Sequence, residues 1–262
     1  MLSLKISTYP QIRSFRLQDI LSKCDSLQTI VVDVREPTLS HQIQWAFEGK
    51  LRELVITGRN LAIIVPDAFQ GLNNANDLIV RITNTSVKHL PDSLLQYLAD
   101  IRYITIDLSG NLLRTVSPSV FFTNIDDYRH SWKTWQSRQL LGGIILENNP
   151  LVCDCNLLWI SQWMREVFTE MKSINVEAAI HAKSKLSLSR CERPICSIDS
   201  QPVVSPNITA SVSIIDLRDE DLCHQQHCKQ EARIMWPSSS SWFRNVNNFV
   251  LSVAITMIIA IN

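Results

Sequence analysis

Apolar and polar residues alternate in a short motif that recurs along residues 1–148. In its clearest copy, Ile106 and Leu108 flank a polar residue, and Asn111 and Leu113 follow at fixed offsets. Alternation over so few residues predicts a short β-strand with one buried face. The copies recur about every 26 residues, a period typical of proteins built from stacked repeats.

Five copies and a final half copy fit the chain. A single unit cannot bury its own apolar face, so we expect successive strands to stack in parallel into one sheet. The later Leu, Pro and Phe positions are expected to return along the opposite side and fill the interior. The equivalent positions in the other copies are Leu4, Ile6 and Tyr9; Ile30, Val32, Arg35 and Pro37; Leu54, Ile56, Arg59, Leu61, Ile64, Pro66 and Phe69; Val80, Ile82, Thr85, Val87 and Pro91; Ile144, Leu146 and Asn149.

The asparagine position of the motif is kept in only two copies. Asn111 and Asn149 retain it, whereas Arg35, Arg59 and Thr85 stand at the same place in other copies. A buried asparagine side chain can satisfy the backbone polar groups of such a turn. The substituted turns must therefore find other hydrogen-bond partners.

Residues 149–164 differ from the repeats. Cys153 and Cys155 follow a tight Asn-Pro dipeptide, and apolar residues at helical spacing come next. Trp159 and Trp163 are four residues apart, so they share one helix face. We expect a covalently tethered helix that closes the open apolar edge of the repeats. The apolar helix positions are Leu157, Leu158, Ile160, Met164, Val167 and Phe168.

Together, the repeat and the Cys-x-Cys segment resemble the extracellular leucine-rich repeat proteins and their cysteine-rich C-terminal flanking cap. The resemblance covers residues 1–228. It implies an α/β fold, a leucine-rich repeat solenoid with a curved parallel sheet, closed by a disulfide-bonded C-terminal helical cap. The expected organisation is repeats at 1–148, cap at 149–230, linker at 231–248 and a hydrophobic segment at 249–262.

The resemblance also implies a disulfide pattern. The family pairs the first cap cysteine with the third and the second with the fourth, which here gives Cys153–Cys191 and Cys155–Cys223. Cys196 and Cys228 are left to pair with each other. Six cysteines allow fifteen connectivities, so the spacing alone does not select this one.

A zinc site is the alternative use of the later cysteines. Their residue types suit zinc, but the spacing of four within each pair exceeds the usual two. An oxidising compartment would also favour disulfides, so we expect no metal and no other cofactor. The residues concerned are Cys191, Cys196, Cys223, His224, His227 and Cys228.

Charge and cysteine content restrict the compartment and the partner. The formal net charge is zero, which argues against nucleic acid as a partner, because phosphate binding requires concentrated positive charge. Dense cysteines and glycosylation sequons at Asn84 and Asn207 favour an oxidising compartment. Residues 1–16 lack the pattern of a secretory signal peptide, so we expect the sequence to be a fragment of a longer protein. The alternative is a cytosolic protein with free thiols.

The chain ends in a pattern typical of a lipid-anchor signal. Four serines at 238–241 are followed by a polar spacer at 242–248 and an apolar run at 249–261. We expect lipid attachment at Ser238 on the extracellular face of the plasma membrane. The alternative is a short single-pass transmembrane helix that begins near Trp242.

The chain lacks the sequence motifs of common catalytic sites, such as a Gly-x-Ser-x-Gly elbow or a phosphate-binding glycine loop, so we predict that it is not an enzyme. Binding suits a curved sheet better, because its outward strand positions form a broad surface. Those positions include Arg81, which Glu53 and Asp107 are expected to flank. The long insertion at 124–139 adds aromatic and basic residues of the kind found in binding hot spots. The alternative is a long return path on the convex side with its tryptophans packed inward. The protein-binding candidates are Arg52, Glu53, Arg81, Asp107, Arg129, Trp132 and Trp135.

These patterns predict a cell-surface module that binds a protein ligand in adhesion or receptor-type recognition. The alternative is a structural or co-receptor subunit that supports the ectodomain of a membrane partner without a ligand of its own. In both cases the expected attachment to the membrane is through the C-terminal tail.

Overall fold

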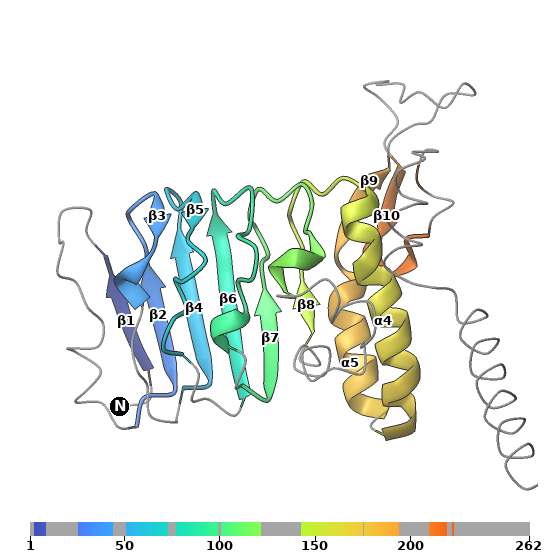
Figure 1. Cartoon of the computed structure of the whole chain (residues 1–262), viewed down its shortest axis with the longest axis horizontal. Helices are drawn as coiled ribbons and strands as arrows, with labels where there is room; N and C mark the ends of the chain where they lie inside the picture. Colours follow the sequence, from blue (N-terminus) through green and yellow to red (C-terminus); the bar gives the residue numbers. More distant parts are fainter. Residues whose placement is uncertain are drawn as a thin grey trace, which may run out of the picture.

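The computed structural model contains a six-stranded parallel sheet with a helical layer at its C-terminal end (Figure 1). It describes residues 3–8, 26–43, 51–72, 77–98, 101–121, 143–174, 176–193, 210–218 and 222. The strands follow one another in chain order, as expected when each repeat adds one strand. They are β1 (Ser3–Ser7), β2 (Thr29–Asp33), β4 (Glu53–Gly58), β6 (Asp77–Thr85), β7 (Tyr103–Asp107) and β8 (Ile144–Ile145).

The strand register confirms the repeat alignment predicted from the sequence. Ile6 pairs with Val32, and Val32 pairs with Ile56. The register continues from Ile56 to the next strand, with a shift at the end of β4. The copy that contains the long insertion also joins the sheet, because Ile106 pairs with Ile144. Each inward apolar side chain therefore stacks on the equivalent residue of the neighbouring repeat.

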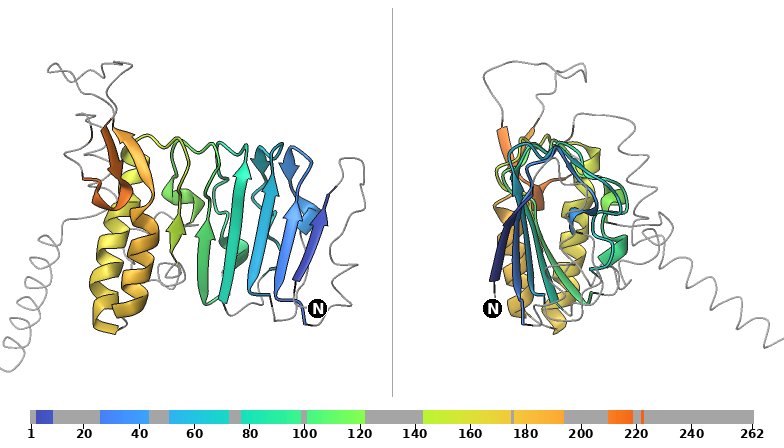
Figure 2. Two further views of the ribbon diagram at one scale, coloured as in Figure 1. Left: turned by 180° about the vertical axis from the view of Figure 1, so that it is seen from behind. Right: turned by 90° about the vertical axis from the view of Figure 1, so that its left-hand side faces the viewer.

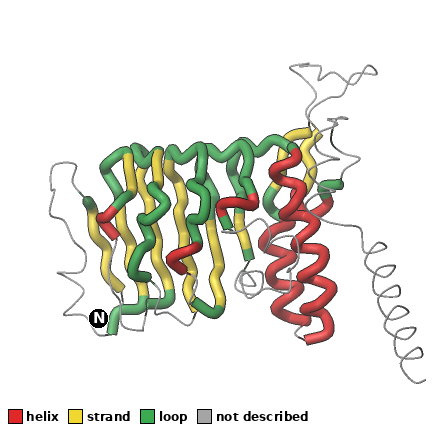
Figure 3. Tube along the Cα trace, in the orientation of Figure 1, coloured by secondary structure: helices red, strands yellow, loops and turns green. Residues whose placement is uncertain are grey.

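The return segments of the repeats form a second layer on one side of the sheet (Figures 2 and 3). They contain the two-residue strands β3 (Thr38–Leu39) and β5 (Ile63–Ile64) and short 3₁₀ helices at His41–Ile43, Gln96–Leu98 and Pro118–Val120. Their apolar side chains fill the space between the two layers, as predicted. Pro37 and Pro66 are exceptions, since both are exposed. Buried members include Leu61, Ile64, Phe69, Val116 and Phe121.

Asn111 links two repeats through its buried side-chain amide. Its Oδ1 accepts hydrogen bonds from the backbone N–H and the hydroxyl of Thr85, at 3.0 and 2.7 Å. Its Nδ2 donates to the carbonyls of Ile82 and Leu108. Thr85 occupies the asparagine position of its own repeat, and its hydroxyl also accepts from the Val87 N–H. The threonine hydroxyl thus makes one of the backbone hydrogen bonds of this turn that an asparagine side chain would otherwise make.

The residue just before the asparagine position has a left-handed backbone in three repeats. Asn84, Gly110 and Asn148 have φ values of 56°, 68° and 55°. Such values are easiest for glycine and, among other residues, for asparagine. A Cβ atom on Gly110 would lie 2.6 Å from Asn84 Oδ1, so a larger residue at position 110 would strain the left-handed backbone and push the Asn84 side chain aside.

Two helices close the C-terminal end of the sheet (Figure 1). They are α4 (Cys155–Ile174) and α5 (Val176–Ser187), and they are followed by the antiparallel pair β9 (Arg190–Arg193) and β10 (Ala210–Ser213). The sequence predicted the first helix but not α5 or the strand pair. Among the helices that the structure describes, none combines the length and apolar character needed to cross a membrane. The apolar tail at 249–262 lies outside the described residues.

The two tryptophans of α4 form the plug that the sequence predicted. Trp159 and Trp163 are each 1% exposed, and their ring centroids are 6.4 Å apart. The Trp159 Nε1 donates to the Val116 carbonyl at 2.8 Å, and its ring lies 5.5 Å from that of Phe121. Burial of each indole contributes about 4–6 kcal/mol by area, as an upper estimate. The last full repeat is therefore sealed by apolar contact and one directional bond.

The Asn111→Ala variant should lose about 2–4 kcal/mol of unfolding free energy, because it leaves several buried backbone groups without partners. Asn60→Ala is the control, since Asn60 is an exposed asparagine in the turn of an earlier repeat. It should change stability by less than about 0.5 kcal/mol. Urea denaturation of both variants measures the difference, and equal midpoints would contradict the role assigned to Asn111.

Candidate protein-binding surface and its cap

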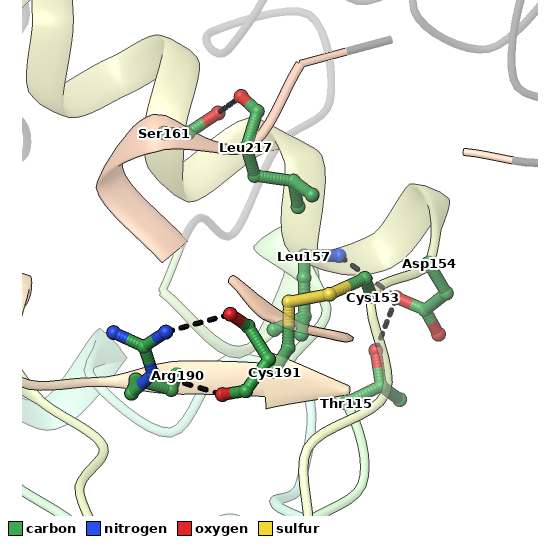
Figure 4. Close-up of a disulfide and its surroundings, with 9 residues drawn as sticks. Thr115, Cys153, Asp154, Leu157, Ser161, Arg190, Cys191 and Leu217 are labelled. Carbon is green, nitrogen blue, oxygen red and sulfur yellow. Dashed lines mark hydrogen bonds between the residues drawn. A yellow bond between two sulfur atoms is a disulfide. The ribbon is translucent and has the colours of Figure 1, made fainter. Parts of the chain in front are cut away.

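A disulfide fastens the start of α4 to β9. Cys153 and Cys191 are bonded, with an S–S distance of 2.03 Å and Cα atoms 5.1 Å apart, which is the pairing that the resemblance implies (Figure 4). Cys155 is also disulfide-bonded, and its partner lies outside the described residues. The pairings Cys155–Cys223 and Cys196–Cys228 therefore stay predictions.

The oxidised state of Cys191 contradicts its use as a zinc ligand, because a metal-bound cysteine must be a free thiolate. Within the described ranges, no group of three or more His, Cys, Asp or Glu residues could hold a metal ion. The remaining residues of the zinc alternative, at positions 196, 223, 224, 227 and 228, lie outside these ranges.

Asp154 caps the N-terminus of α4 beside the disulfide (Figure 4). Its Oδ1 accepts from the Leu157 N–H at 3.0 Å and from the Thr115 hydroxyl at 2.9 Å. Burial raises the pKa of the Asp154 carboxyl, and the hydrogen bonds from Thr115 and Leu157 oppose that rise. The Asp154 side chain therefore joins the last full repeat to the helix, although its carboxylate is held partly out of water.

The outward side chains of the strands form one face of the sheet, called here the outer sheet face. Outward residues at equivalent positions of successive repeats are paired across the strands and form rows. The first row consists of Lys5, Val31, Val55, Arg81, Asp107 and Ile145. A second row lies two residues earlier along each strand and contains Glu53 between Thr29 and Ile79.

Arg81 forms ion pairs with carboxylates on both neighbouring strands. Its Nε donates to Glu53 Oε1 and its Nη1 to Asp107 Oδ2, each at 2.8 Å. These three residues are called here the Arg81 cluster. The side chain of Arg81 is 35% exposed and that of Asp107 only 10%. The hydrogen bond that Arg81 donates to Glu53 is the largest cause that raises the pKa of Arg81, so the guanidinium is charged and held in place.

The cap carries a further cation whose pKa responds to the charges of this cluster. Lys185 lies near the end of α5, which contacts β8, and its side chain is partly buried. Burial lowers the pKa of Lys185, the charge of Arg81 lowers it further, and the charge of Asp107 opposes both effects. Lys185 is therefore close enough to interact with the charges of the sheet. No sequence pattern indicated this, because the position of α5 depends on tertiary packing.

Tyr103 is a second surface residue that the sequence pattern left unassigned. It is 38% exposed and begins β7, with Asp77 as its partner on β6. The Arg102 guanidinium carbon lies 5.1 Å from the centroid of its ring. The signal was present, since Tyr103 shares the strand alternation of Asp107, which the sequence placed among the binding candidates of the sheet surface.

The other candidate residues are divided between the described and undescribed parts of the chain. Arg52 is exposed just before the N-terminal end of β4, which is an inner strand of the sheet. Asn84 is exposed at the end of β6. The remaining candidates lie outside the described residues. They are Arg129, Trp132, Trp135, Asn207 and Ser238.

Comparison with known proteins gives relatives whose sequences match part of this chain. The chain is 26% identical over 167 residues to chaoptin of Tribolium castaneum. It is 29% identical over 120 residues to the leucine-rich repeat and fibronectin type III domain-containing protein 1-like protein of Danio rerio, and 29% over 153 residues to the high affinity nerve growth factor receptor of Rattus norvegicus. These matches cover 63%, 46% and 55% of this chain.

The chain spans 20%, 16% and 18% of the lengths of these relatives. Human 5T4 (Wnt-activated inhibitory factor 1, trophoblast glycoprotein) is a solved structure similar to this one at 14% identity and a TM-score of 0.37, with 85% of this chain and 78% of that chain covered. No protein-family model matches the chain. The in-register repeats, the disulfide cap and the relatives together identify a leucine-rich repeat protein.

The Asp154→Asn variant should make the unfolding free energy less dependent on pH. Because the folded-state pKa is raised, the carboxyl favours folding when protonated, and this contribution is lost as pH rises from the ordinary value of 3.8 through the folded value. Asn keeps the capping oxygen without the buried charge. Relative to the variant, the parent chain should therefore lose unfolding free energy between about pH 3 and pH 7.

Urea denaturation at both pH values measures this difference. Asp216→Asn is the control, because Asp216 is exposed in the 3₁₀ helix Ile214–Asp216. Asp154→Ala removes the capping oxygen of α4 and should lower the unfolding free energy by about 0.5–2 kcal/mol at either pH. If the parent chain instead became more stable relative to Asp154→Asn as pH rose, the pKa of Asp154 would be lowered by folding, which would contradict the prediction.

Proposed function

We propose that this chain is a protein-recognition module of a cell-surface protein and that it binds its ligand with the outer sheet face, centred on the Arg81 cluster. The observation that carries the proposal is the in-register row of side chains that includes Arg81 and Asp107, placed on an exposed sheet rather than in the core. A rigid parallel sheet holds such side chains at fixed separations. The surface is therefore organised before a ligand arrives.

The chemistry of this face suits a protein ligand. Val31, Val55 and Ile79 are half-buried on the same face as the Arg81 cluster, so apolar area lies beside oriented charges. Binding energy at protein interfaces concentrates where apolar contacts and arginine are surrounded by polar residues. The ion pairs also restrain the Arg81 side chain, which reduces the entropy lost on binding.

The relatives support the class of function. Two of the proteins to which the chain is similar are named growth factor receptors, for NT-3 and for nerve growth factor. We extend from them only the idea of a receptor-type role in protein recognition. Placement on the extracellular face of the plasma membrane, with lipid attachment at Ser238, belongs to the same proposal and rests on the sequence of the tail.

The test is a screen of the full chain, displayed as multimers, against a panel of cell-surface ectodomains. A specific binder should lose at least about tenfold in affinity when Arg81 is changed to Gln, as expected for a central interface arginine. Arg59→Gln is the matched control, because Arg59 is exposed in the turn after β4 and not on the outer sheet face. It should leave the affinity unchanged.

A fold defect must be separated from a binding defect, because Arg81→Gln leaves Glu53 and Asp107 without their cation. The double variant Arg81→Gln/Asp107→Asn removes the cation together with its more buried carboxylate and leaves only Glu53, whose side chain is 28% exposed, without its partner. Its thermal unfolding should resemble that of the parent chain. Weak binding by this stable double variant supports the proposal. Binding that is unchanged in both variants would place the ligand on another surface.

A further inference from the structure

We propose that Asn84 carries an N-linked glycan that stands at the rim of the outer sheet face and screens the Arg81 cluster from large partners. The sequence offers a sequon here, Asn84-Thr85-Ser86, and the fold decides where a glycan on it would stand. This screening role goes beyond the proposed function and can be tested without knowledge of the ligand.

The backbone at Asn84 turns out of the strand while its side chain stays exposed. Its φ is 56°, and its N–H donates to the Ser109 carbonyl at 3.2 Å, which fixes the residue against the next repeat. Its side-chain oxygen lies next to Gly110, where a Cβ atom would meet it at 2.6 Å. One atom of the amide group is thus placed against a glycine that leaves room for it. The residue itself remains exposed, as a bulky substituent requires.

Equivalent positions in the neighbouring repeats differ from Asn84 in an informative way. Gly110 occupies this place in the next repeat, so it offers no amide. In the preceding repeat the register shifts at the end of β4, where Gly58 pairs with Thr85 and has a φ of 151°. Asn148 has the same left-handed backbone in the last half repeat, but Asn149 and Pro150 follow it, which is not a sequon. Within the described repeats, this backbone position combines with a sequon only at Asn84.

The sheet geometry places the attachment point near the Arg81 cluster. Asn84 follows Arg81 by three residues on β6, which corresponds to about 10 Å along a strand. Asp107 is linked to the same rim, because its Oδ1 accepts from the Ser109 N–H at 3.0 Å. A bulky oligosaccharide at this point would therefore sit above one end of the surface and leave the opposite strand ends open.

The covalent step is a group transfer to the side-chain amide. The Asn84 Nδ2–H bond breaks and a bond forms between Nδ2 and the anomeric carbon of an oligosaccharide. The donor is a polyisoprenoid-linked diphosphate oligosaccharide, whose diphosphate leaves and takes up the proton. No electron is gained or lost, so no oxidant or reductant is needed.

The experiment uses the full chain, expressed behind a secretory leader in eukaryotic cells. Mass spectrometry of the peptide that contains residue 84 should show a glycan. Asn84→Gly should remove it without harm to the fold, since glycine readily adopts the left-handed backbone of this position, as Gly110 does in the next repeat. Asn207→Gln removes the other sequon and serves as the matched control for general effects of glycosylation.

Screening is measured with a reporter thiol introduced on the outer sheet face. In a Thr83→Cys background, the rate of labelling by a large polyethylene glycol maleimide is divided by the rate with iodoacetamide, and the chain without the reporter is subtracted. Asn84→Gly should raise this ratio about threefold or more, because it removes a bulky obstacle one residue away. In a Thr29→Cys background, at the far end of the sheet strands, the ratio should hardly change.

Each outcome supports or overturns the screening role. A glycan at residue 84 with a raised ratio in Asn84→Gly, but not in Asn207→Gln, supports it. An unmodified Asn84 overturns it, and so does a glycan whose removal leaves the ratio at position 83 unchanged. None of these results depends on a ligand, so failure here leaves the proposed function to its own test.

Discussion

The structure depends on the stacking of apolar strand faces that no repeat can bury alone. Ile30 and Leu54 are 0% exposed because a neighbour lies on each side of them, whereas Leu4 on the edge strand is only partly buried. Each repeat adds little stability by itself and depends on its neighbours, so the last repeat requires a cover. Trp159 and Trp163 provide that cover, and the Cys153–Cys191 bond holds it in place.

The same stacking that builds the core also aligns the surface. Successive side chains of a strand point to opposite faces, so a register that stacks the apolar residues also brings their outward neighbours together. Arg81 meets carboxylates on both adjacent strands for this reason, although the three residues are far apart in the chain. Recognition chemistry on this face is thus a consequence of core packing rather than a separate feature.

The turns show how the repeat tolerates departures from its pattern. The Asn111 side chain makes hydrogen bonds to backbone groups of two repeats. The Thr85 hydroxyl makes a similar backbone hydrogen bond in its own repeat. At the preceding position the backbone is left-handed, which restricts the choice to glycine or asparagine and places Asn84 at the rim. One local backbone requirement therefore determines where an exposed amide can occur beside the binding surface.

The sequence by itself determined the repeat, the strand register, the helix with its paired tryptophans and the meeting of Arg81 with Glu53 and Asp107. These features follow from periodic alternation and short spacing, which are local properties of the chain. Only the tertiary structure decided the place of α5, the approach of Lys185 to the sheet and the contact of Asn84 with Gly110. The physical reason is that these depend on how the cap and the repeats pack together, and no period along the chain encodes that packing.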